Sequence, residues 1–359
     1  MNTALGAPPE NILLIQLGDI GDVVLTTPTI RSVKEAYPNA RVSILVFKPC
    51  ATLLAADPYV HEVVETARLR GSLFQRLKEY AGFARYLRQK HYDLVIDLRT
   101  GDRGAIFSFL TGAPARIGFR GSKKQFWHEI AFTKILDDLK AAPLPVHPGA
   151  DQSLRIVRAI GIGAADSTPR LYIAPEDLLR ASLLLAEAGI VQGTKMVTVN
   201  PFSRWKYKEW DNAKWGRVID QIWEVHHIPS VLVGSREEFA AGQEIVAGRE
   251  GYVINLAGKT TLGKLAAVIS LSSLHLGVDS AAPHIAAALG TPTVTIHGPS
   301  DWRAWRIVNE YHRVVSPVMD CVPCNKAGCD DSGRSRCMEE LAAEPVFSAA
   351  LELLGMLNH

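Results

Sequence analysis

Two carboxylates, Asp19 and Asp22, alternate with glycines in the segment Gly-Asp-Ile-Gly-Asp, which follows an apolar run at residues 12–17. The segment lacks the three spaced glycines of a dinucleotide site and the Gly-Lys-Ser/Thr of a P-loop. A carboxylate on such a turn can act as a general base that deprotonates a hydroxyl, and Gly21 would let a substrate come close. Aspartate is also a favoured capping residue, so one of the two could instead cap the helix that follows.

A second polar turn is formed by Asp279 and Ser280, which separate an apolar run from a stretch of small residues that carries His284. A strand that turns into a helix leaves backbone N–H groups aimed at the space above the sheet, and this suits a phosphate or another anion. Asp279 and His284 would flank that ligand. The alternative for His284 is a buried or capping histidine.

Three cations and two tryptophans occupy the loop at residues 200–210, after another apolar run. Lys206 or Lys208 could neutralise a leaving phosphate there, and Asn200 and Ser203 could form hydrogen bonds with it. The alternative is a solvated basic loop whose second tryptophan packs into the core.

Two further acidic residues, Glu237 and Glu238, follow the apolar run at residues 230–234 and open an expected helix. One of them could bind a ribose or a base. Acidic residues in the first turn of a helix are also favoured by the helix dipole alone.

Four cysteines lie within 17 residues in a C-x2-C-x4-C-x7-C pattern: Cys321, Cys324, Cys329 and Cys337. Thiols at this density could close a structural zinc site or hold an iron–sulfur cluster, and a structural role is favoured over a catalytic one. The alternatives are reduced free thiols or disulfides, of which the latter are disfavoured in the cytosol.

The length of 359 residues is enough for two domains, each with a full core. A hydrophobic content of 47% and a charged content of 21% argue against disorder, and a net charge of +2 is too small to indicate nucleic-acid binding. There is no apolar run of about 18–20 residues that would span a membrane, and no signal peptide is visible at the start. We therefore expect a cytoplasmic protein.

The first half of the chain is rich in cations, which could receive a phosphorylated acceptor or an anionic membrane surface. The alternative for some of them is ordinary solvated surface. These cations are Arg68, Arg70, Arg76, Lys78, Arg85, Arg88, Arg99, Arg103, Arg116, Arg120, Lys123 and Lys124.

Apolar runs alternate with helical patterns along most of the chain, which predicts an α/β fold with parallel sheets covered on both faces. The expected strands are residues 12–17, 41–47, 63–64, 92–98, 196–200, 230–234, 252–255, 274–278 and 293–297. The alternation restarts after a linker near residues 165–175. Ligands of such sheets bind beyond the carboxyl ends of the strands, so two facing sheets would enclose the active site in the cleft between them.

Five segments together carry a family resemblance: residues 17–28, 208–210, 255–261, 277–284 and 298–301. In this order and spacing the chain resembles, nearly end to end, the ADP-heptose–lipopolysaccharide heptosyltransferases, glycosyltransferase family 9. The resemblance implies a GT-B architecture of two facing Rossmann-like domains.

The resemblance also divides the chain into three parts. Residues 1–170 would bind the acceptor and residues 171–343 the nucleotide-sugar donor. The final helix, within residues 344–359, would pack back on the first domain, as it often does in the family.

The resemblance assigns roles to single residues. Asp22 is similar to the catalytic base, Lys208 to the lysine that meets the donor phosphates, and Glu238 to the acidic residue near the ribose. Asp279 is similar to the aspartate that contacts the donor sugar. The turn that cradles the diphosphate is matched by Ser280, Ala281, Ala282 and His284. The family more often has glycine where Ala281 stands, and this departure fits the heptosyltransferase III subgroup better.

The resulting hypothesis is an inverting transfer of heptose from ADP-heptose to the lipid A–core acceptor, without a cofactor. Asp22 would deprotonate the acceptor hydroxyl, while Lys208 and helix N–H groups stabilise the leaving ADP. The enzyme would be peripheral on the inner face of the inner membrane. The alternatives are another sugar-nucleotide enzyme of the same build, such as an epimerase, or a metal-binding interaction module centred on the cysteines.

Overall fold

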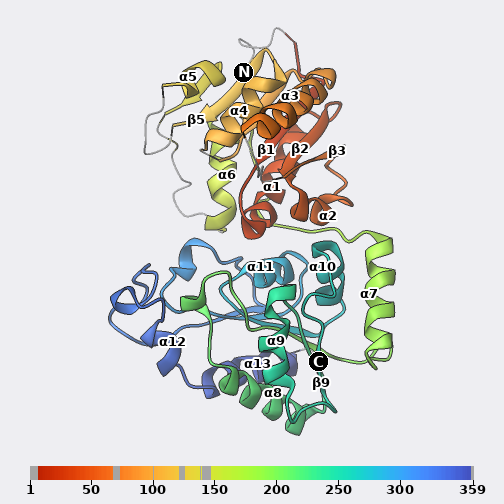
Figure 1. Ribbon diagram of the computed structural model, residues 1–359, viewed down its shortest axis with the longest axis vertical. Helices are drawn as coiled ribbons and strands as arrows, with labels where there is room; N and C mark the ends of the chain where they lie inside the picture. The colour runs from red at the N-terminus through yellow and green to blue at the C-terminus, as the bar shows by residue number, and fades with distance from the viewer. Residues whose placement is uncertain are drawn as a thin grey trace. The chain divides into compact units, whose positions relative to one another are not determined.

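The computed structural model describes residues 7–67, 73–99, 101–120, 126–137, 139 and 147–356. The chain divides into two compact units, unit 1 (Met1–Tyr172) and unit 2 (Ile173–His359). Each unit contains one parallel sheet with helices around it (Figure 1). The division falls in the segment that the sequence marks as a linker.

The sheet of unit 1 has the strand order β3-β2-β1-β4-β5-β6. Its strands are β1 (Asn11–Gln16), β2 (Arg41–Phe47), β3 (Glu62–Thr66), β4 (Leu94–Asp97), β5 (Ala115–Phe119) and β6 (Lys134–Leu136). The chain order reverses between β1 and β4, where Ile15 lies opposite Asp97. The central strands are mainly apolar because helices cover both faces of a parallel sheet.

Helices of unit 1 connect successive strands. They are α1 (Ile20–Ala36), η1 (Lys48–Cys50), α2 (Ala51–Leu54), α3 (Leu73–Gln89), α4 (Asp102–Thr111), α5 (His128–Ala131) and α6 (Pro148–Ala159). The last of them, α6, packs against α1, and the Thr29 and Ser153 hydroxyls lie 2.7 Å apart at this contact. The helix that follows β1 is therefore held by the end of unit 1 as well as by its own sheet.

The sheet of unit 2 has the strand order β12-β11-β10-β7-β8-β9, which is the same winding as in unit 1. Its strands are β7 (Val197–Asn200), β8 (Ser230–Leu232), β9 (Val253–Asn255), β10 (Leu274–Val278), β11 (Thr293–Ile296) and β12 (His312–Val315). Here the order reverses between β7 and β10. In doubly wound sheets the carboxyl ends of the strands at this point form the ligand crevice.

The helical segments of unit 2 are more numerous. They are α7 (Pro175–Glu187), η2 (Lys206–Lys208), α8 (Asn212–His226), η3 (Arg236–Glu238), α9 (Phe239–Val246), α10 (Leu262–Ser270), α11 (Ala281–Ala288), η4 (Trp302–Ala304), η5 (Cys329–Asp331), α12 (Arg336–Glu340) and α13 (Glu344–Met356). Of these, α13 packs against α8 and strands β10, β11 and β12. The final helix, which the sequence suggests as a return to the first domain, is thus part of the core of unit 2.

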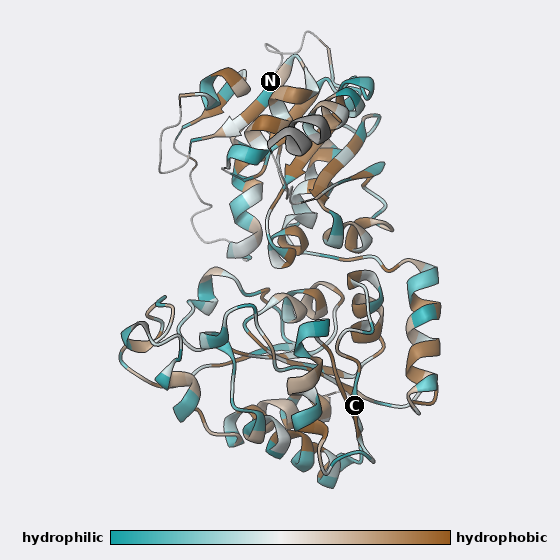
Figure 2. Cartoon of the chain, in the orientation of Figure 1, coloured by the Kyte–Doolittle hydropathy of each residue, from teal (hydrophilic) through white to brown (hydrophobic). Residues whose placement is uncertain are grey.

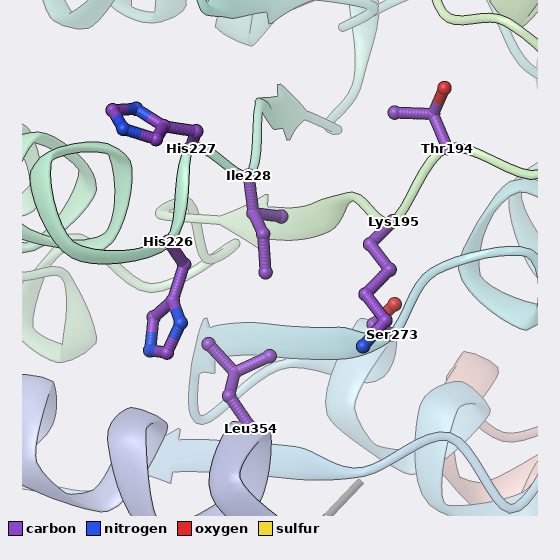
Figure 3. Close-up of a pocket in the computed structure, with 7 residues that line it drawn as sticks. All are labelled: Thr194, Lys195, His226, His227, Ile228, Ser273 and Leu354. Atoms are coloured by element: carbon purple, nitrogen blue, oxygen red, sulfur yellow. The ribbon is translucent and has the colours of Figure 1, made fainter. Parts of the chain in front are cut away.

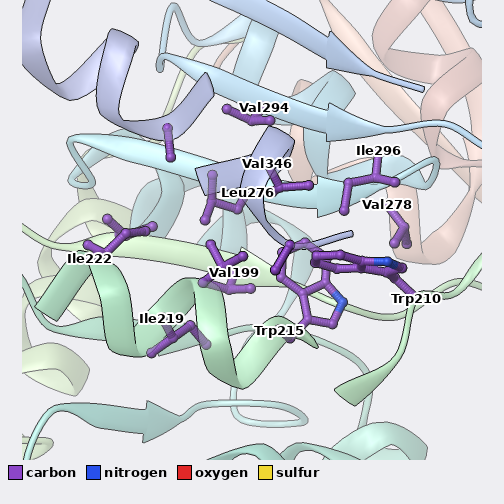
Figure 4. Packing of buried hydrophobic residues seen from close by; sticks show 14 of the residues in the cluster. Val199, Trp210, Trp215, Ile219, Ile222, Leu276, Val278, Val294, Ile296 and Val346 are labelled. Atoms are coloured by element: carbon purple, nitrogen blue, oxygen red, sulfur yellow. The ribbon is translucent and has the colours of Figure 1, made fainter. Parts of the chain in front are cut away.

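A large apolar cluster fills the space between α8, α13 and the sheet of unit 2 (Figure 4). Trp210 and Trp215 meet edge to face at its centre, with ring centroids 5.1 Å apart. The Trp210 indole N–H donates to the Leu341 carbonyl at 3.0 Å, which satisfies its one polar atom. The second tryptophan of the loop at residues 200–210 is therefore a core anchor.

The hydrophobic residues are concentrated on the strands, and the polar residues on the outer faces of the helices (Figure 2). Within the described ranges, none of the helices is both long enough and apolar enough to cross a membrane.

Candidate active site

The carboxyl ends of β7 and β10 bring two predicted residues of unit 2 together. Asn200 ends β7 opposite Gly277 of β10, and Ser280 follows two residues after β10. The Ser280 hydroxyl donates to Asn200 Oδ1 at 2.8 Å, and Asn200 Nδ2 donates to the Val233 carbonyl at 2.9 Å. These bonds join three strand ends at the crevice and fix the orientation of the Asn200 amide.

The loop after β7 presents one of its two candidate lysines to this crevice. Lys208 Nζ lies 2.6 Å from Asp279 Oδ2, and the two side chains are only 20% and 10% exposed. Lys206 lies three residues from Glu209, binds both oxygens of that carboxylate and is 71% exposed. The choice between the two lysines that the sequence leaves open is thus decided by geometry in favour of Lys208 as the lysine at the crevice.

The Asp279 carboxylate is buried yet remains charged. Burial raises its pKa, but the electrostatic interactions with His297 and Lys208 and the hydrogen bonds from Lys208 and Ser300 act in the opposite direction, and the pKa is lowered to about 2. The Ser203 hydroxyl donates to the Asp279 carbonyl at 3.4 Å, while the Ser203 N–H donates to Glu209 at 2.9 Å. Asp279 is therefore a fixed negative charge, held at both its main chain and its side chain.

The N-terminus of α11 lies directly after this aspartate. Ser280 is the N-cap residue, but its hydroxyl binds Asn200 and does not cap the helix. The first-turn N–H groups of Ala281 and Ala282 have no intrahelical partner by the geometry of a helix start. Half-buried His284 follows in the same turn, so the predicted residues of this turn are contiguous at the crevice.

Glu238 lies after β8, at the neighbouring strand end. Its Oε2 accepts from the Ser235 N–H at 2.6 Å, and the two residues form a capping box at η3. A Cβ at Gly234 would lie 2.8 Å from the same oxygen, so glycine is required for the carboxylate to fold back in this way. The alternative that the sequence offers for Glu238 is stabilisation by the helix dipole, and the structure adds a capping box at the same helix start.

Asp22 lies in unit 1, after β1, at the point where the strand order of that sheet reverses. Its Oδ2 accepts from the Asp19 N–H at 2.9 Å, and Asp19 and Asp22 form a capping box at the start of α1. The Arg99 guanidinium, from the loop after β4, pairs with the same oxygen. The Asp22 side chain remains 18% exposed, so a carboxylate that caps the helix is also open at the carboxyl edge of the sheet.

Sequence reasoning missed a second carboxyl group at this edge, Asp97. It ends β4, is 2% exposed and accepts from the Arg99 N–H at 3.0 Å. Burial raises its pKa to about 8, against the smaller opposing effect of Arg99. A Cβ at Gly104 would collide with this carboxyl group, so a glycine in α4 makes room for it. The available signal was a single aspartate that ends a buried apolar run.

Comparison with known proteins identifies the family of this chain. A family model described as glycosyltransferase family 9 (heptosyltransferase) matches residues 80–333, well over half of the chain. The chain belongs to glycosyltransferase family 9. It is therefore a glycosyltransferase, as the resemblance implies.

Individual family 9 proteins are similar along most of their length. Lipopolysaccharide heptosyltransferase 3 of Escherichia coli is 29% identical over 292 residues, covering 79% of this chain and 83% of that protein. The solved structure of the family 9 glycosyltransferase from Veillonella parvula has a TM-score of 0.81 at 21% identity and covers 96% of this chain and 97% of its own. The structure of E. coli ADP-heptose LPS heptosyltransferase II has a TM-score of 0.79 at 21% identity, with 97% and 100% covered. The fold is therefore the predicted GT-B architecture, with two parallel α/β sheets.

The cations of the first half have mixed surroundings in this family 9 chain. Arg116 donates to the Ala113 and Ala131 carbonyls, Arg120 pairs with Asp137, and Arg99 with Asp22. Arg85 and Arg88 are exposed on α3. Arg68, Arg70, Lys123 and Lys124 lie outside the described residues, as do the side chains of Arg76 and Lys78. Part of the predicted basic surface is therefore engaged in holding unit 1 together.

The cysteine pattern does not produce a metal centre in the part of the chain that the structure describes. Cys321 and Cys329 are exposed, Cys324 is partly buried and Cys337 is buried, and all four are free thiols. No group of three or more His, Cys, Asp or Glu side chains among the described residues could hold a metal ion. Burial raises the pKa of Cys337 to about 11, so its thiol is neutral at physiological pH. The expected structural metal is not supported.

A separate pocket of about 270 Å³ lies at the amino ends of the strands in the unit 2 sheet (Figure 3). Its lining residues precede the strands: Thr194 and Lys195 come before β7, Ile228 before β8 and Ser273 before β10. Ligands of doubly wound sheets bind at the carboxyl edge, so this pocket is not the family 9 active site.

Proposed function

We propose that this glycosyltransferase transfers heptose from ADP-heptose to the inner core of lipopolysaccharide, with inversion at the anomeric carbon. The observation that carries the proposal is the buried Lys208–Asp279 pair next to the uncapped N-terminus of α11. The relatives of this chain support the substrate, because they are lipopolysaccharide heptosyltransferases. A heptosyltransferase of the same fold was solved with ADP-2-deoxy-2-fluoro heptose, at a TM-score of 0.71 and 17% identity.

Unit 2 would bind the donor. The Ala281 and Ala282 N–H groups and His284 would receive the diphosphate, where the positive end of the helix dipole favours an anion. Lys208 would neutralise the charge that develops on the leaving ADP, and Asp279 would accept hydrogen bonds from the heptose hydroxyls. Glu238 would hold the ribose, and Asn200 and Ser203 would keep the crevice in shape. These groups stabilise a leaving diphosphate, so no cofactor is needed.

Unit 1 would bind the acceptor and supply the base. Asp22 would take the proton of the acceptor hydroxyl as its oxygen attacks the anomeric carbon. The bond to the ADP oxygen would break on the opposite face of the sugar, which inverts the configuration. Arg99 would hold the carboxylate in place through the ion pair described above.

The acceptor would be met at the inner face of the inner membrane, with the enzyme bound there as a peripheral protein. Arg85 and Arg88 support this because both are exposed and lie three residues apart on α3, which places them on one face. Such a face attracts the phosphates of a lipid A–core acceptor or of anionic lipids.

The test is a transfer assay with purified protein, ADP-heptose and a heptose-deficient lipopolysaccharide acceptor. The expected result is an acceptor that gains the mass of one heptose, with one ADP released and the anomeric configuration inverted by NMR. ADP-heptose that is altered without any acceptor would contradict the proposal and favour an epimerase-type reaction. Thermal stabilisation by UDP-sugars but not by ADP or ADP-heptose would contradict the choice of donor.

A further inference from the structure

His297 is a buried histidine beside the donor site, directly after β11. Its side chain is 4% exposed, and its backbone N–H donates to the Val315 carbonyl at 2.9 Å. Its Nδ1 lies 3.9 Å from Asp279 Oδ2, the same oxygen that Lys208 binds. Among the residues that the structure describes, this nitrogen has no hydrogen-bond partner. A buried polar atom without a hydrogen-bond partner costs free energy, and a rearrangement that supplies a partner recovers that cost.

The charged and titratable groups around His297 come from three segments. Asp279 and His284 face it from the start of α11, Lys208 from the loop after β7, and Asp301 from the loop that follows His297. The ring lines the same pocket as Asp279, Ser280 and His284, together with Arg306 and Arg313. His297 is thus part of the crevice wall and is not enclosed in the apolar core.

The Lys208–Asp279 pair poses a problem for donor binding. Lys208 is bound to Asp279 at 2.6 Å, but its proposed role requires the ammonium group to reach the donor phosphates. Once it turns away, the Asp279 carboxylate remains in a position that is 10% exposed, without its closest positive partner. The hydrogen bond from Ser300 remains on the carboxylate. A buried charge that loses its ion-pair partner is strongly destabilising, so a second group that takes the place of Lys208 would stabilise the donor-bound state.

We propose that His297 is a positioning residue that replaces Lys208 as the hydrogen-bond partner of Asp279 when the donor diphosphate binds. The inference rests on the proposed function of Lys208 and Asp279. A ring movement of about 1 Å brings Nδ1 within hydrogen-bond distance of Oδ2. Lys208 is then free for the phosphates, and Asp279 keeps the orientation in which it receives the sugar.

The exchange needs no proton from solvent. Burial lowers the pKa of His297 to about 4, so the ring is neutral at physiological pH. A neutral imidazole carries one N–H, and a neighbouring carboxylate favours the tautomer with the hydrogen on Nδ1. That tautomer donates to Asp279 without becoming charged.

The backbone next to His297 is held by tight packing against Cys337 and Met338. A Cβ at Gly298 would lie 2.5 Å from Met338 Sδ and 3.2 Å from Cys337 Sγ, so this part of the chain packs tightly against the α12 region. The Pro299 carbonyl accepts from the Asn325 N–H at 2.7 Å in the same contact. The ring therefore moves by side-chain rotation on a fixed main chain. This packing gives the cysteine-containing segment a structural role at the donor site.

The experiment is calorimetric titration with ADP of the full chain and of His297→Asn, His297→Gln and His297→Leu. The amide nitrogen of asparagine lies near the position of Nδ1, whereas that of glutamine lies near Nε2. The exchange predicts that Leu and Gln weaken ADP binding by about tenfold, the size of one lost charge-assisted hydrogen bond, while Asn stays within about threefold of wild type. Thermal melting of each variant shows whether it is folded. If His297→Leu does not fold, the comparison of His297→Asn with His297→Gln is decisive.

Lys208→Ala and the double variant Lys208→Ala/His297→Leu separate the possible failures. Without Lys208 there is no exchange, so His297→Leu should have little further effect on ADP affinity. Equal effects of His297→Leu in both backgrounds, or no effect in the wild type, would overturn the inference while leaving the proposed function in place. ADP binding that is unaffected by Lys208→Ala would overturn both, because Lys208 would then not meet the phosphates.

Discussion

Each unit places an aspartate at the point where the strand order of its sheet reverses, but after different strands: Asp22 follows β1, and Asp279 follows β10, whose counterpart in unit 1 is β4. The two aspartates also relate in opposite ways to the helix that comes next. In unit 1, Asp22 lies inside the first turn of α1 and accepts from the Asp19 N–H in a capping box. In unit 2, Asp279 precedes α11, and the N-cap residue Ser280 binds Asn200 instead of the helix. The start of α1 is thus occupied by its own carboxylate, whereas the start of α11 has no side-chain cap.

This difference indicates which of the two helix starts is better suited to bind an anion. A helix start that already binds a carboxylate has lost part of its attraction for a phosphate, whereas an uncapped start with a nearby lysine retains it. The unit 1 site is instead a carboxylate next to an arginine, suited to accept a proton from a hydroxyl. In the proposed function, similar strand–turn–helix geometry would therefore provide a base in one unit and a diphosphate site in the other.

The largest expected effect tests the role proposed for Asp22 in unit 1. Asp22→Asn should lower kcat by about 10³-fold, as expected for loss of a general base, with ADP affinity unchanged. The asparagine carbonyl can still accept from the Asp19 N–H, so the capping role is retained. Asp19→Asn is the matched control, since it changes the other carboxylate of the same capping box. Equal losses in both variants would assign the effect to the helix start and not to a base.

A smaller effect is expected from the lysines of unit 2. Lys208→Ala should raise the donor KM and reduce kcat/KM by about 10–100-fold, the range for a lost hydrogen bond to a charged group. Lys206→Ala should stay within about twofold, because an exposed ion pair with Glu209 contributes little. Steady-state kinetics with ADP-heptose measure both. Similar effects of the two variants would mean that charge in the loop matters and that the contact with Asp279 does not.

The smallest expected effect compares how the stability of each unit depends on pH. In unit 1, burial raises the pKa of Asp97 to about 8, so the folded unit holds an extra proton; this contribution is complete below about pH 4 and is lost as the pH rises to 8. In unit 2, burial lowers the pKa of His275 to about 3 and of His297 to about 4. Their contribution is complete above about pH 6.5 and is lost as the pH falls toward 4.

The two units should therefore respond in opposite directions, by about 1.4 kcal/mol per pH unit for each proton. Hydrogen exchange, corrected for the intrinsic rate, should show amides of β4 opening more easily from pH 5 to 8 and those of β10 and β11 from pH 6.5 to 4. Asp97→Asn should remove the dependence in unit 1 and leave that of unit 2. If the stability of both units changed in the same direction with pH, the titrating groups named here would be wrong. An unchanged pH dependence of unit 1 in Asp97→Asn would likewise show that Asp97 is not the group responsible.

Most of the fold could be predicted because buried parallel strands are continuous apolar runs. The strands expected at residues 41–47 and 274–278 coincide with β2 and β10. Three strands were not predicted: β5, β6 and β12. They lie at or next to a sheet edge, where fewer neighbours cover them, and residues such as Arg116, Lys134 and Arg313 interrupt their apolar pattern.

The site was predictable where a motif and a strand end coincide, and not elsewhere. Asp279 and Lys208 both follow predicted strands, and the carboxyl ends of neighbouring parallel strands meet at one edge. The direction of Lys206 and Lys208 depends on the short turn η2, which spacing alone does not define. Asp97 and His297 belong to no motif, and only burial and the approach of other side chains give them a role.

The packing of α13 has a consequence for how the protein is made. Val346, Ala350, Leu353 and Leu354 complete the apolar cluster that also contains Val199 of β7 and Leu276 of β10. The ribosome delivers these residues about 150 positions after the first strand of the unit, whereas every strand of unit 1 emerges much earlier. Domains generally fold as units during synthesis. Unit 1 can therefore fold while translation continues, whereas unit 2 cannot complete this apolar cluster until α13 leaves the exit tunnel.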